Sequence, residues 1–195
     1  MFLSYLILME TLKALLTRRS ISKLTMPQPT KDEMKDVYQA ALRAPDHSWL
    51  RPWKFIEVSG DSRKKLGQAF INTTKKSEEL DEEREKKIAA LTDRSPMIIV
   101  VIAKINYDKP NVPRLEQIQS TAAATQNILL ALHDKGYGAY WRTGKYSSER
   151  NKYISSELSL ENNEEVLGYL YVGTPEVDTP KIPVLQNEEF VTYWS

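Results

Sequence analysis

The apolar positions at the start of the chain recur at helical spacing. Over residues 9–19, Leu12, Leu15 and Leu16 follow one another at intervals that place them on one side of a helix. Ser20 comes next and interrupts the pattern. This stretch therefore predicts a first helix, which ends close to a pair of adjacent arginines.

A second helix is predicted from its start signal as well as from its pattern. The turn PQPT at 27–30 ends in Thr30, whose hydroxyl can cap the helix, and Glu33 follows three residues later to complete a capping box. The helix should continue to about Arg43. Pro45 disfavours helical geometry in the residue before it, so the chain is expected to leave the helix there.

Two later stretches have the patterns of strands. KFIEVSG at 54–60 alternates between apolar and polar positions and ends in glycine, which predicts a strand. PMIIVVIAKI at 96–105 is an unbroken apolar run and suits a strand that is covered on both faces. Between them, residues 61–94 have a helical pattern, with KSEELDEEREKK as a solvated, charged face. A mobile lid over a pocket is the alternative interpretation of that charged run.

The second half of the chain continues the alternation of helices and strands. A helix is predicted over 114–134, where small residues precede bulky ones and Gly136 ends the pattern. A strand over 137–144, a helix over 147–158 and a last buried strand over 165–175 follow. Strands that alternate with helices indicate an α/β or α+β protein.

The tail over 175–195 has three prolines and then the apolar, strand-prone sequence FVTYW. A domain-sized core seldom leaves such an end exposed to water. We therefore expect the tail to pack, with the surface of a partner subunit as the candidate place.

Composition excludes several classes of protein. The 195 residues suffice for one domain with a substantial core. The 27 Lys and Arg residues balance 26 Asp and Glu residues, which argues against a nucleic-acid partner. Cysteine is absent, which excludes disulfides and thiolate ligands and fits a reducing, cytoplasmic compartment. With only His47 and His133 and no paired-His motif, no bound metal is expected.

The first residues, MFLSYLIL, are apolar but lack the basic region and cleavage site of a signal peptide. The apolar run stops at Glu10 and is too short to span a bilayer, which needs about 20 apolar residues. We interpret Met9 as the original start, residues 1–8 as an extension, and residues 9–195 as a single domain. A short membrane-touching anchor is the alternative.

The common glycine-rich phosphate loops GxGxxG and GxxxxGK[ST] are missing, so side chains must hold any cofactor phosphate. Arg18, Arg19 and Ser20 supply a dense set of donors for that purpose, although adjacent arginines also compensate a helix dipole. Arg142 and Thr143 stand at the end of a predicted strand, where pockets in layered proteins form. A surface ion pair is the alternative role for Arg142.

Three segments, taken together and in order, resemble the nitroreductase family of FMN-dependent oxidoreductases, and its small bacterial branch with an RAPDH motif in particular. They are RRS at 18–20, the loop RAPDHSWLRPW at 43–53, and GYGAYWRTG at 136–144. VPRLEQ at 112–117, LGYLYVGTP at 167–175 and the terminal FVTYW also match that branch. The resemblance runs from about Met9 to Trp194, which is nearly the whole chain.

The resemblance implies an α+β fold with a central, mostly antiparallel sheet flanked by helices. It also implies a homodimer with two FMN sites at the subunit interface and a C-terminal tail that reaches the partner. By similarity, Arg18, Arg19 and Ser20 hold the phosphate and ribityl end of FMN. Arg142 and Thr143 from the later strand join them.

The resemblance places the RAPDH loop against the flavin ring of the other subunit. Arg43 and His47 are the loop residues that it implies for this contact, and the prolines fix the shape of the loop. Trp49, Trp53 and Trp141 would contribute bulk, with Trp141 in the cofactor-binding set. Plain core or interface packing is the alternative for each tryptophan.

The implied function is reduction of an electron-poor acceptor, such as a nitroaromatic or a quinone, by NAD(P)H in a ping-pong mechanism. The hydride chemistry belongs to the flavin, so no catalytic side chain is expected. A non-catalytic flavin-binding or structural dimer is the alternative. Asp46, Trp49 and Arg51 stand where many relatives carry serine, asparagine and glutamine. Arg51 either favours an anionic substrate, tunes the flavin, or pairs with Asp46.

Overall fold

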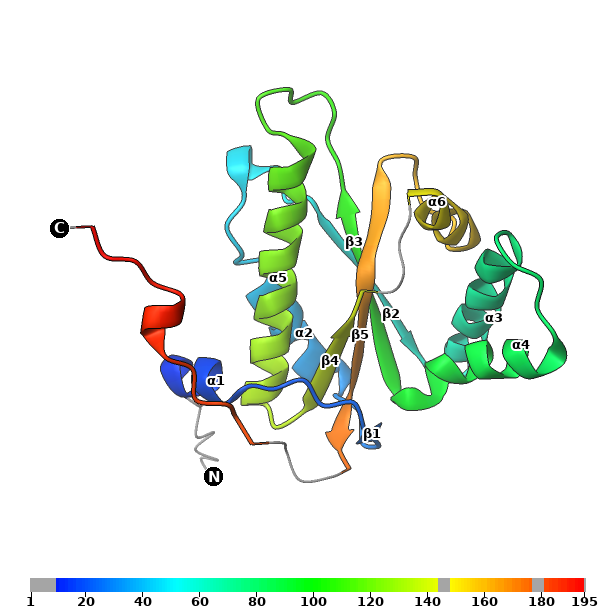
Figure 1. The fold of residues 1–195 in the computed structure, drawn as a ribbon, viewed down its shortest axis with the longest axis horizontal. Coiled ribbons are helices and arrows are strands. Elements are labelled where there is room, and N and C mark those ends of the chain that lie inside the picture. Colours follow the sequence, from blue (N-terminus) through cyan, green and yellow to red (C-terminus); the bar gives the residue numbers. More distant parts are fainter. Residues whose placement is uncertain (1–9, 144–147, 177–180, 195) are drawn as a thin grey trace.

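The computed structural model describes residues 10–143, 148–176 and 181–194 (Figure 1). The extension proposed at residues 1–8 lies outside these ranges. The helices are α1 (Thr11–Thr17), α2 (Lys31–Ala41), α3 (Ser62–Lys75), α4 (Glu82–Ala89), α5 (Arg114–Asp134) and α6 (Ser148–Glu157). The strands are β1 (Leu24–Thr25), β2 (Trp53–Ser59), β3 (Met97–Lys104), β4 (Gly138–Arg142) and β5 (Glu164–Pro175). Short 3₁₀ turns cover His47–Trp49, Ala90–Arg94 and Asn187–Glu189.

The five strands form one sheet whose named pairings are all antiparallel, as predicted. The strand order is β1-β5-β3-β2, and β4 pairs with β5. The only parallel contact within the described ranges is an isolated bridge between Ser20 and Ala139. The register of β3 on β5 shifts between Val101 and Ile102, where Gly168 stands on the opposite strand. The fold is therefore α+β.

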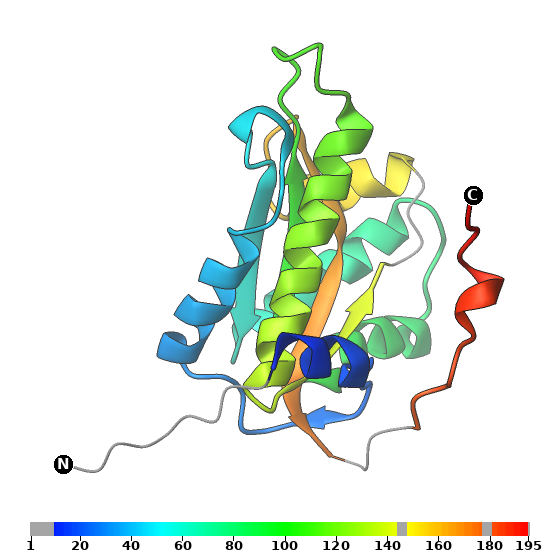
Figure 2. The same cartoon turned by 90° about the vertical axis from the view of Figure 1, so that its left-hand side faces the viewer.

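Helices cover both faces of the sheet (Figures 1 and 2). On one face, α2 and α5 bury Val37, Ile128 and Leu132 against the sheet. On the other face, α3 and α6 contribute Leu66 and Ile154. The central strand β3 supplies both cores, because Met97, Ile99 and Val101 belong to the first and Ile98, Val100 and Ile102 to the second. The prediction of a strand covered on both faces is confirmed.

A local signal accounts for the start of α2. The Thr30 hydroxyl accepts a hydrogen bond from the Glu33 amide at 3.2 Å, and the Glu33 carboxylate accepts one from the Thr30 amide at 2.8 Å. This is the predicted capping box, with both hydrogen bonds present. The helix ends at Ala41, two residues before the predicted end.

The charged region after β2 is divided into two helices and a 3₁₀ turn. Helices α3 and α4 are separated by residues 76–81, where the apolar face of the pattern is interrupted. On α4, Glu82 pairs with Lys86 and Glu83 pairs with Lys87 on exposed positions. The interpretation of this run as a solvated face is confirmed for α4.

The two ends of the described chain differ from expectation. Helix α1 has only seven residues, and it buries Ala14 while Leu12, Leu15 and Leu16 stay exposed. The tail sequence FVTYW forms no strand, since residues 190–194 follow a 3₁₀ turn and extend away from the sheet (Figure 2). The strand propensity of the tail is thus not realised in one chain, because no strand edge among the described residues pairs with it. Its aromatic side chains are exposed, with Trp194 at 97%.

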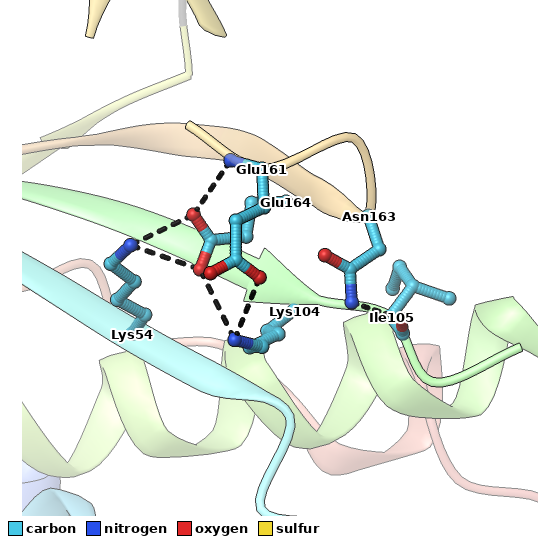
Figure 3. Close-up of polar contacts among 6 residues, drawn as sticks. All are labelled: Lys54, Lys104, Ile105, Glu161, Asn163 and Glu164. Atoms are coloured by element: carbon cyan, nitrogen blue, oxygen red, sulfur yellow. Dashed lines mark hydrogen bonds and ion pairs between the residues drawn. The ribbon is translucent and has the colours of Figure 1, made fainter. Parts of the chain in front are cut away.

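An ionic cluster around one buried carboxylate closes one end of the sheet (Figure 3). The Glu164 side chain is fully buried, and both of its carboxylate oxygens accept hydrogen bonds from the Lys54 ammonium at 2.8 and 2.9 Å. Lys104 lies 3.7 Å away and also pairs with the exposed Glu161 at 3.0 Å. Burial opposes ionisation, but these donors overcome it and lower the pKa of Glu164. The cluster joins β2, β3 and the start of β5.

Candidate functional site

The RRS segment lies along the outer edge of β4. The amide of Ile21 donates a hydrogen bond to the Ala139 carbonyl at 3.1 Å, next to the parallel bridge between Ser20 and Ala139. Just before it, the Thr17 hydroxyl lies 2.8 Å from His133 Nε2 in the last turn of α5. The fold therefore fixes the arginines between the end of α5 and the edge of the sheet.

Arg18 and Arg19 carry positive charge that their surroundings leave uncompensated. Both are half-buried, and within the described part of the chain neither makes an ion pair with a carboxylate. Burial lowers the pKa of His133, and the nearby charges of Arg18 and Arg19 lower it further. Arg18 is the C-cap residue of α1, so its charge also lies at the negative end of the dipole of that seven-residue helix. Two adjacent unneutralised guanidiniums suit a dianionic ligand.

Successive residues of β4 point to opposite faces of the sheet. Trp141 packs against the core beneath α2 and α5, and a Cβ on Gly168 would collide with its indole nitrogen. Within one chain, Trp141 thus packs against the core, which is the alternative to cofactor contact that the sequence allowed. Tyr140 and Arg142 lie on the other face, where Tyr140 packs with the second core and Arg142 borders a cavity. Cofactor contact by Trp141 stays a prediction, as it does for Thr143, which is exposed just beyond β4.

The cavity beside Arg142 has a volume of about 690 Å³ and lies between the sheet and the α3–α4 layer. Its aromatic wall comes from Phe70, Tyr169 and Tyr171, with Phe70 and Tyr169 in edge-to-face contact at 4.9 Å between ring centroids. Its charged wall is basic, because one carboxylate accompanies four cations. These ionic residues are Glu78, Arg84, Lys87, Arg94 and Arg142.

Two hydroxyl groups that border the cavity lack hydrogen-bond partners. Tyr171 and Thr73 are 1% and 3% exposed, and neither side-chain oxygen has a partner of normal geometry among the described residues. Burial raises the pKa of Tyr171, with Arg142 opposing the shift in part. Because buried polar groups are nearly always paired, these oxygens suit a ligand that brings polar atoms into the cavity.

The RAPDH loop is fixed at the other end of α5. The His47 imidazole lies 2.7 Å from the Glu116 carboxylate in the first turn of that helix. Ser48, Trp49 and Arg51 all have positive φ angles, of 61°, 57° and 48°. Each such conformation costs a non-glycine residue about 1 to 2 kcal/mol. The loop is therefore held in a strained shape by its surroundings, as binding loops often are.

The structure separates the two halves of the implied site within one chain. The RRS segment lies near His133, whereas His47 binds Glu116. These two α5 residues stand near opposite ends of a 21-residue helix, about 25 Å apart at 1.5 Å per residue. Arg43 is exposed just after α2, close to His47 in sequence. One chain therefore brings the RRS segment to β4 but does not bring His47 to it.

Several residues of the cavity were not predicted from the sequence. Tyr171 pairs with Tyr140 and Tyr169 pairs with Arg142 across the β4–β5 ladder. The alternation of β5 could have placed both tyrosines on the face of Arg142, had the register been known. Lys87 and Arg94 carried no signal, because charged residues are common throughout their segment.

Neither a metal-binding cluster nor a membrane-spanning helix is found in the ranges that the structure covers. No group of three or more acidic or histidine side chains there is arranged to hold a metal ion. No helix there is both long and apolar enough to cross a bilayer.

The antiparallel sheet between two helical layers is the fold of solved nitroreductase-like proteins. A nitroreductase-like family protein from Bacillus cereus superposes with a TM-score of 0.79 at 24% identity, covering 100% of this chain and 99% of that one. A mutant form of the FMN and NADPH-dependent nitroreductase NfnB superposes with a TM-score of 0.74 at 15% identity, covering 96% of this chain and 100% of that one. At these identities the similarity establishes the fold.

The chain belongs to the nitroreductase family, whose model matches residues 15–174. It is 31% identical over 191 residues to an Escherichia coli K12 protein named "Putative NAD(P)H nitroreductase YdjA", with 95% of this chain and 100% of that protein covered. A Haemophilus influenzae protein named "Putative NAD(P)H nitroreductase" is 32% identical over 186 residues, again with 95% and 100% covered. The protein is therefore an oxidoreductase of this family.

Proposed function

We propose that the protein is an FMN-dependent oxidoreductase that uses NADH or NADPH to reduce an electron-poor acceptor of the nitroaromatic or quinone type. The observation that carries the proposal is the unneutralised pair Arg18 and Arg19 on the edge of β4, the strand that ends in Arg142 at the cavity. The names of the relatives, NAD(P)H nitroreductases, support a nicotinamide donor, and the FMN and NADPH dependence of NfnB supports FMN as the cofactor.

The residues present fit FMN. The phosphate carries nearly two negative charges, and Arg18, Arg19 and the Ser20 hydroxyl would hold it, because each charge-assisted hydrogen bond contributes about 1.5 to 3 kcal/mol. Arg142 and Thr143 would continue the contacts along β4. The cavity beyond offers aromatic side chains and unpaired hydroxyls, which suit a planar ring with polar edges.

The protein supplies binding and electrostatics rather than a catalytic side chain. FMN, when bound, accepts a hydride from a nicotinamide and passes two electrons to an acceptor, in two separate half-reactions. Arg94 and Arg142, which pair with no carboxylate among the described residues, give the cavity a positive potential, and this stabilises negative charge that develops there. The buried Tyr171 hydroxyl is a donor of fixed position within the same cavity.

A second copy of the chain would complete the site. His47 is about 25 Å from the RRS segment along α5, so it reaches such a site only when another protomer presents it, and the same loop of that protomer would bring Arg43. Exposed apolar side chains on α1 and in the tail, including Leu12, Leu16 and Trp194, provide surface for a homodimer in which the tail packs on the partner.

Colour and bleaching test the proposal. Protein purified without added flavin should be yellow, NADH or NADPH should bleach it under anaerobic conditions, and a nitroaromatic or quinone should restore the colour. Yellow protein that neither nucleotide bleaches would instead identify a non-catalytic flavin-binding protein. Colourless protein that also fails to bind added FMN would contradict both functions.

A further inference from the structure

The RAPDH loop presents an aromatic ring and a cation together on its surface. The Trp49 side chain is 81% exposed, and the Arg51 guanidinium lies over its ring at 5.6 Å from the centroid. A cation over an indole face at this distance is an attractive contact, so the two side chains hold each other in place. We call this pair the Trp49–Arg51 platform.

The backbone beneath the platform is held rigidly. The Asp46 carboxylate accepts a hydrogen bond from the Arg51 amide at 2.8 Å. The Pro52 carbonyl accepts hydrogen bonds from the Thr121 hydroxyl at 2.8 Å and from the Lys104 amide at 2.9 Å. These contacts fix the backbone on both sides of Arg51, whose positive φ angle is unfavourable for a residue other than glycine. The platform is therefore preorganised for a ligand.

The charge of Arg51 is available to an anion. The two carboxylates that contact this loop are otherwise engaged, because Asp46 binds the backbone amide and Glu116 binds His47. Within the described ranges, the Arg51 guanidinium makes no ion pair. Of the roles that the sequence left open for Arg51, charge pairing with Asp46 is not the one adopted.

A ligand that brings its own negative charge explains the platform better than a simple protein contact does. Covering Arg51 with apolar protein surface would remove water from an unpaired guanidinium, which is unfavourable. A planar ring can stack on Trp49 while its carboxylate binds the guanidinium, so the pair recognises both parts of one small molecule.

We propose that Trp49 and Arg51 form the acceptor subsite and select planar aromatic acceptors that carry a carboxylate. This inference rests on the proposed function and on its two-copy arrangement, because His47, two residues before Trp49, is the side chain proposed to lie against the flavin of the other protomer. Trp49 supplies the stacking surface for the acceptor ring. Arg51 supplies the selectivity for charge.

The test compares two matched acceptors in the oxidative half-reaction. Enzyme reduced with one equivalent of NADPH is mixed anaerobically with 4-nitrobenzoate or with 4-nitrobenzamide, and the return of flavin absorbance gives a rate constant for each. Arg51→Gln should lower the ratio of the benzoate rate to the benzamide rate about tenfold, the factor expected for one charge-assisted contact. Lys65→Gln, which removes the same charge from an exposed position on α3, should keep the wild-type ratio. Added salt should lower the ratio of wild type but not of Arg51→Gln.

The outcomes distinguish the proposed subsite from the proposed function on which it rests. A wild-type ratio in Arg51→Gln, with normal flavin content, would overturn the subsite alone. A loss confined to the reduction step with NADPH would also overturn it, because the platform would then serve the donor. Wild-type protein that neither NADH nor NADPH reduces would overturn the proposed function and the subsite together.

Discussion

The Thr17 hydroxyl lies 2.8 Å from His133 Nε2, and this contact ties the end of α1 to the last turn of α5. It determines where the chain carries Arg18 and Arg19, since the segment then passes directly along β4. The arginines proposed to bind the phosphate are thus positioned by this side-chain contact together with the backbone contacts of Ser20 and Ile21 to Ala139. Substitutions can test both the proposed site and the contacts that position it.

Arg19→Ala should release FMN without unfolding the protein. Loss of a charge-assisted contact should weaken flavin binding at least tenfold, whereas the half-exposed position should cost the fold little, about 0.5 kcal/mol. Flavin absorbance after dialysis and thermal unfolding of the apoprotein measure the two effects. Lys13→Ala, which removes an exposed cation from α1, is the matched control. Stoichiometric flavin in Arg19→Ala would contradict the phosphate assignment.

Tyr171→Phe should change stability and affinity in opposite directions. Removing a buried hydroxyl without a partner should stabilise the apoprotein by about 1 kcal/mol. If the hydroxyl serves the cofactor, FMN should bind several-fold more weakly. Urea unfolding and fluorescence titration with FMN check the pair of effects, and Tyr140→Phe is the control on the neighbouring strand. Equal FMN affinity in Tyr171→Phe would exclude the hydroxyl from the site.

The pH dependence of stability should show the contribution of His133. Its pKa is lowered in the fold, so the folded state binds its proton less readily than the unfolded state does. Stability should therefore be fully present above the ordinary histidine pKa of 6.5 and should fall as the pH drops through the lowered folded value. Denaturant unfolding of the apoprotein between about pH 7.5 and about pH 5 should show a smaller loss in His133→Gln. An identical loss in that variant would assign the effect to other groups.

Glu164→Gln should destabilise the sheet by about 1.5 kcal/mol, because it weakens the charge-assisted hydrogen bonds that the buried carboxylate accepts from the partly exposed Lys54. The lowered pKa of Glu164 means that its contribution is present above its ordinary pKa of 4.5 and is lost as the pH falls through the folded value. Glu161→Gln, at the exposed end of the same cluster, should cost about 0.5 kcal/mol or less. Equal losses of unfolding free energy in the two variants, measured with urea, would show that burial of Glu164 does not strengthen its ion pair.

Mixed dimers should test whether two chains build each site. Arg19→Ala and Arg43→Ala should each lose flavin from both sites of a homodimer. In a heterodimer of the two variants, one site receives both altered side chains and the other receives neither. Co-expression with two affinity tags should therefore restore flavin to about half occupancy, whereas a site built within one chain would stay empty in both halves. A flavin-binding monomer in light scattering would contradict the architecture.

Much of the fold could be predicted because its signals are local. The capping box of Thr30 and Glu33 and the bounds of α5 follow from neighbouring residues, and both are found as predicted. The tail shows the limit of this reasoning. Residues 190–194 have strand propensity, but a strand forms only where another edge accepts its hydrogen bonds.

The sequence by itself determined most of the order of helices and strands, though not the short strand β1 or the division of residues 61–94 into α3 and α4, and it determined the strand buried on both faces and the motifs that mark the family. Only the tertiary structure decided that Trp141 and Arg142 serve different faces, that Tyr171 borders the cavity of Arg142, and that His47 lies far from Arg19 in one chain. The physical reason is that strand register and the packing of loops and strands against α5 set these relationships. Both bring together residues far apart in the chain, and no local pattern encodes such distances.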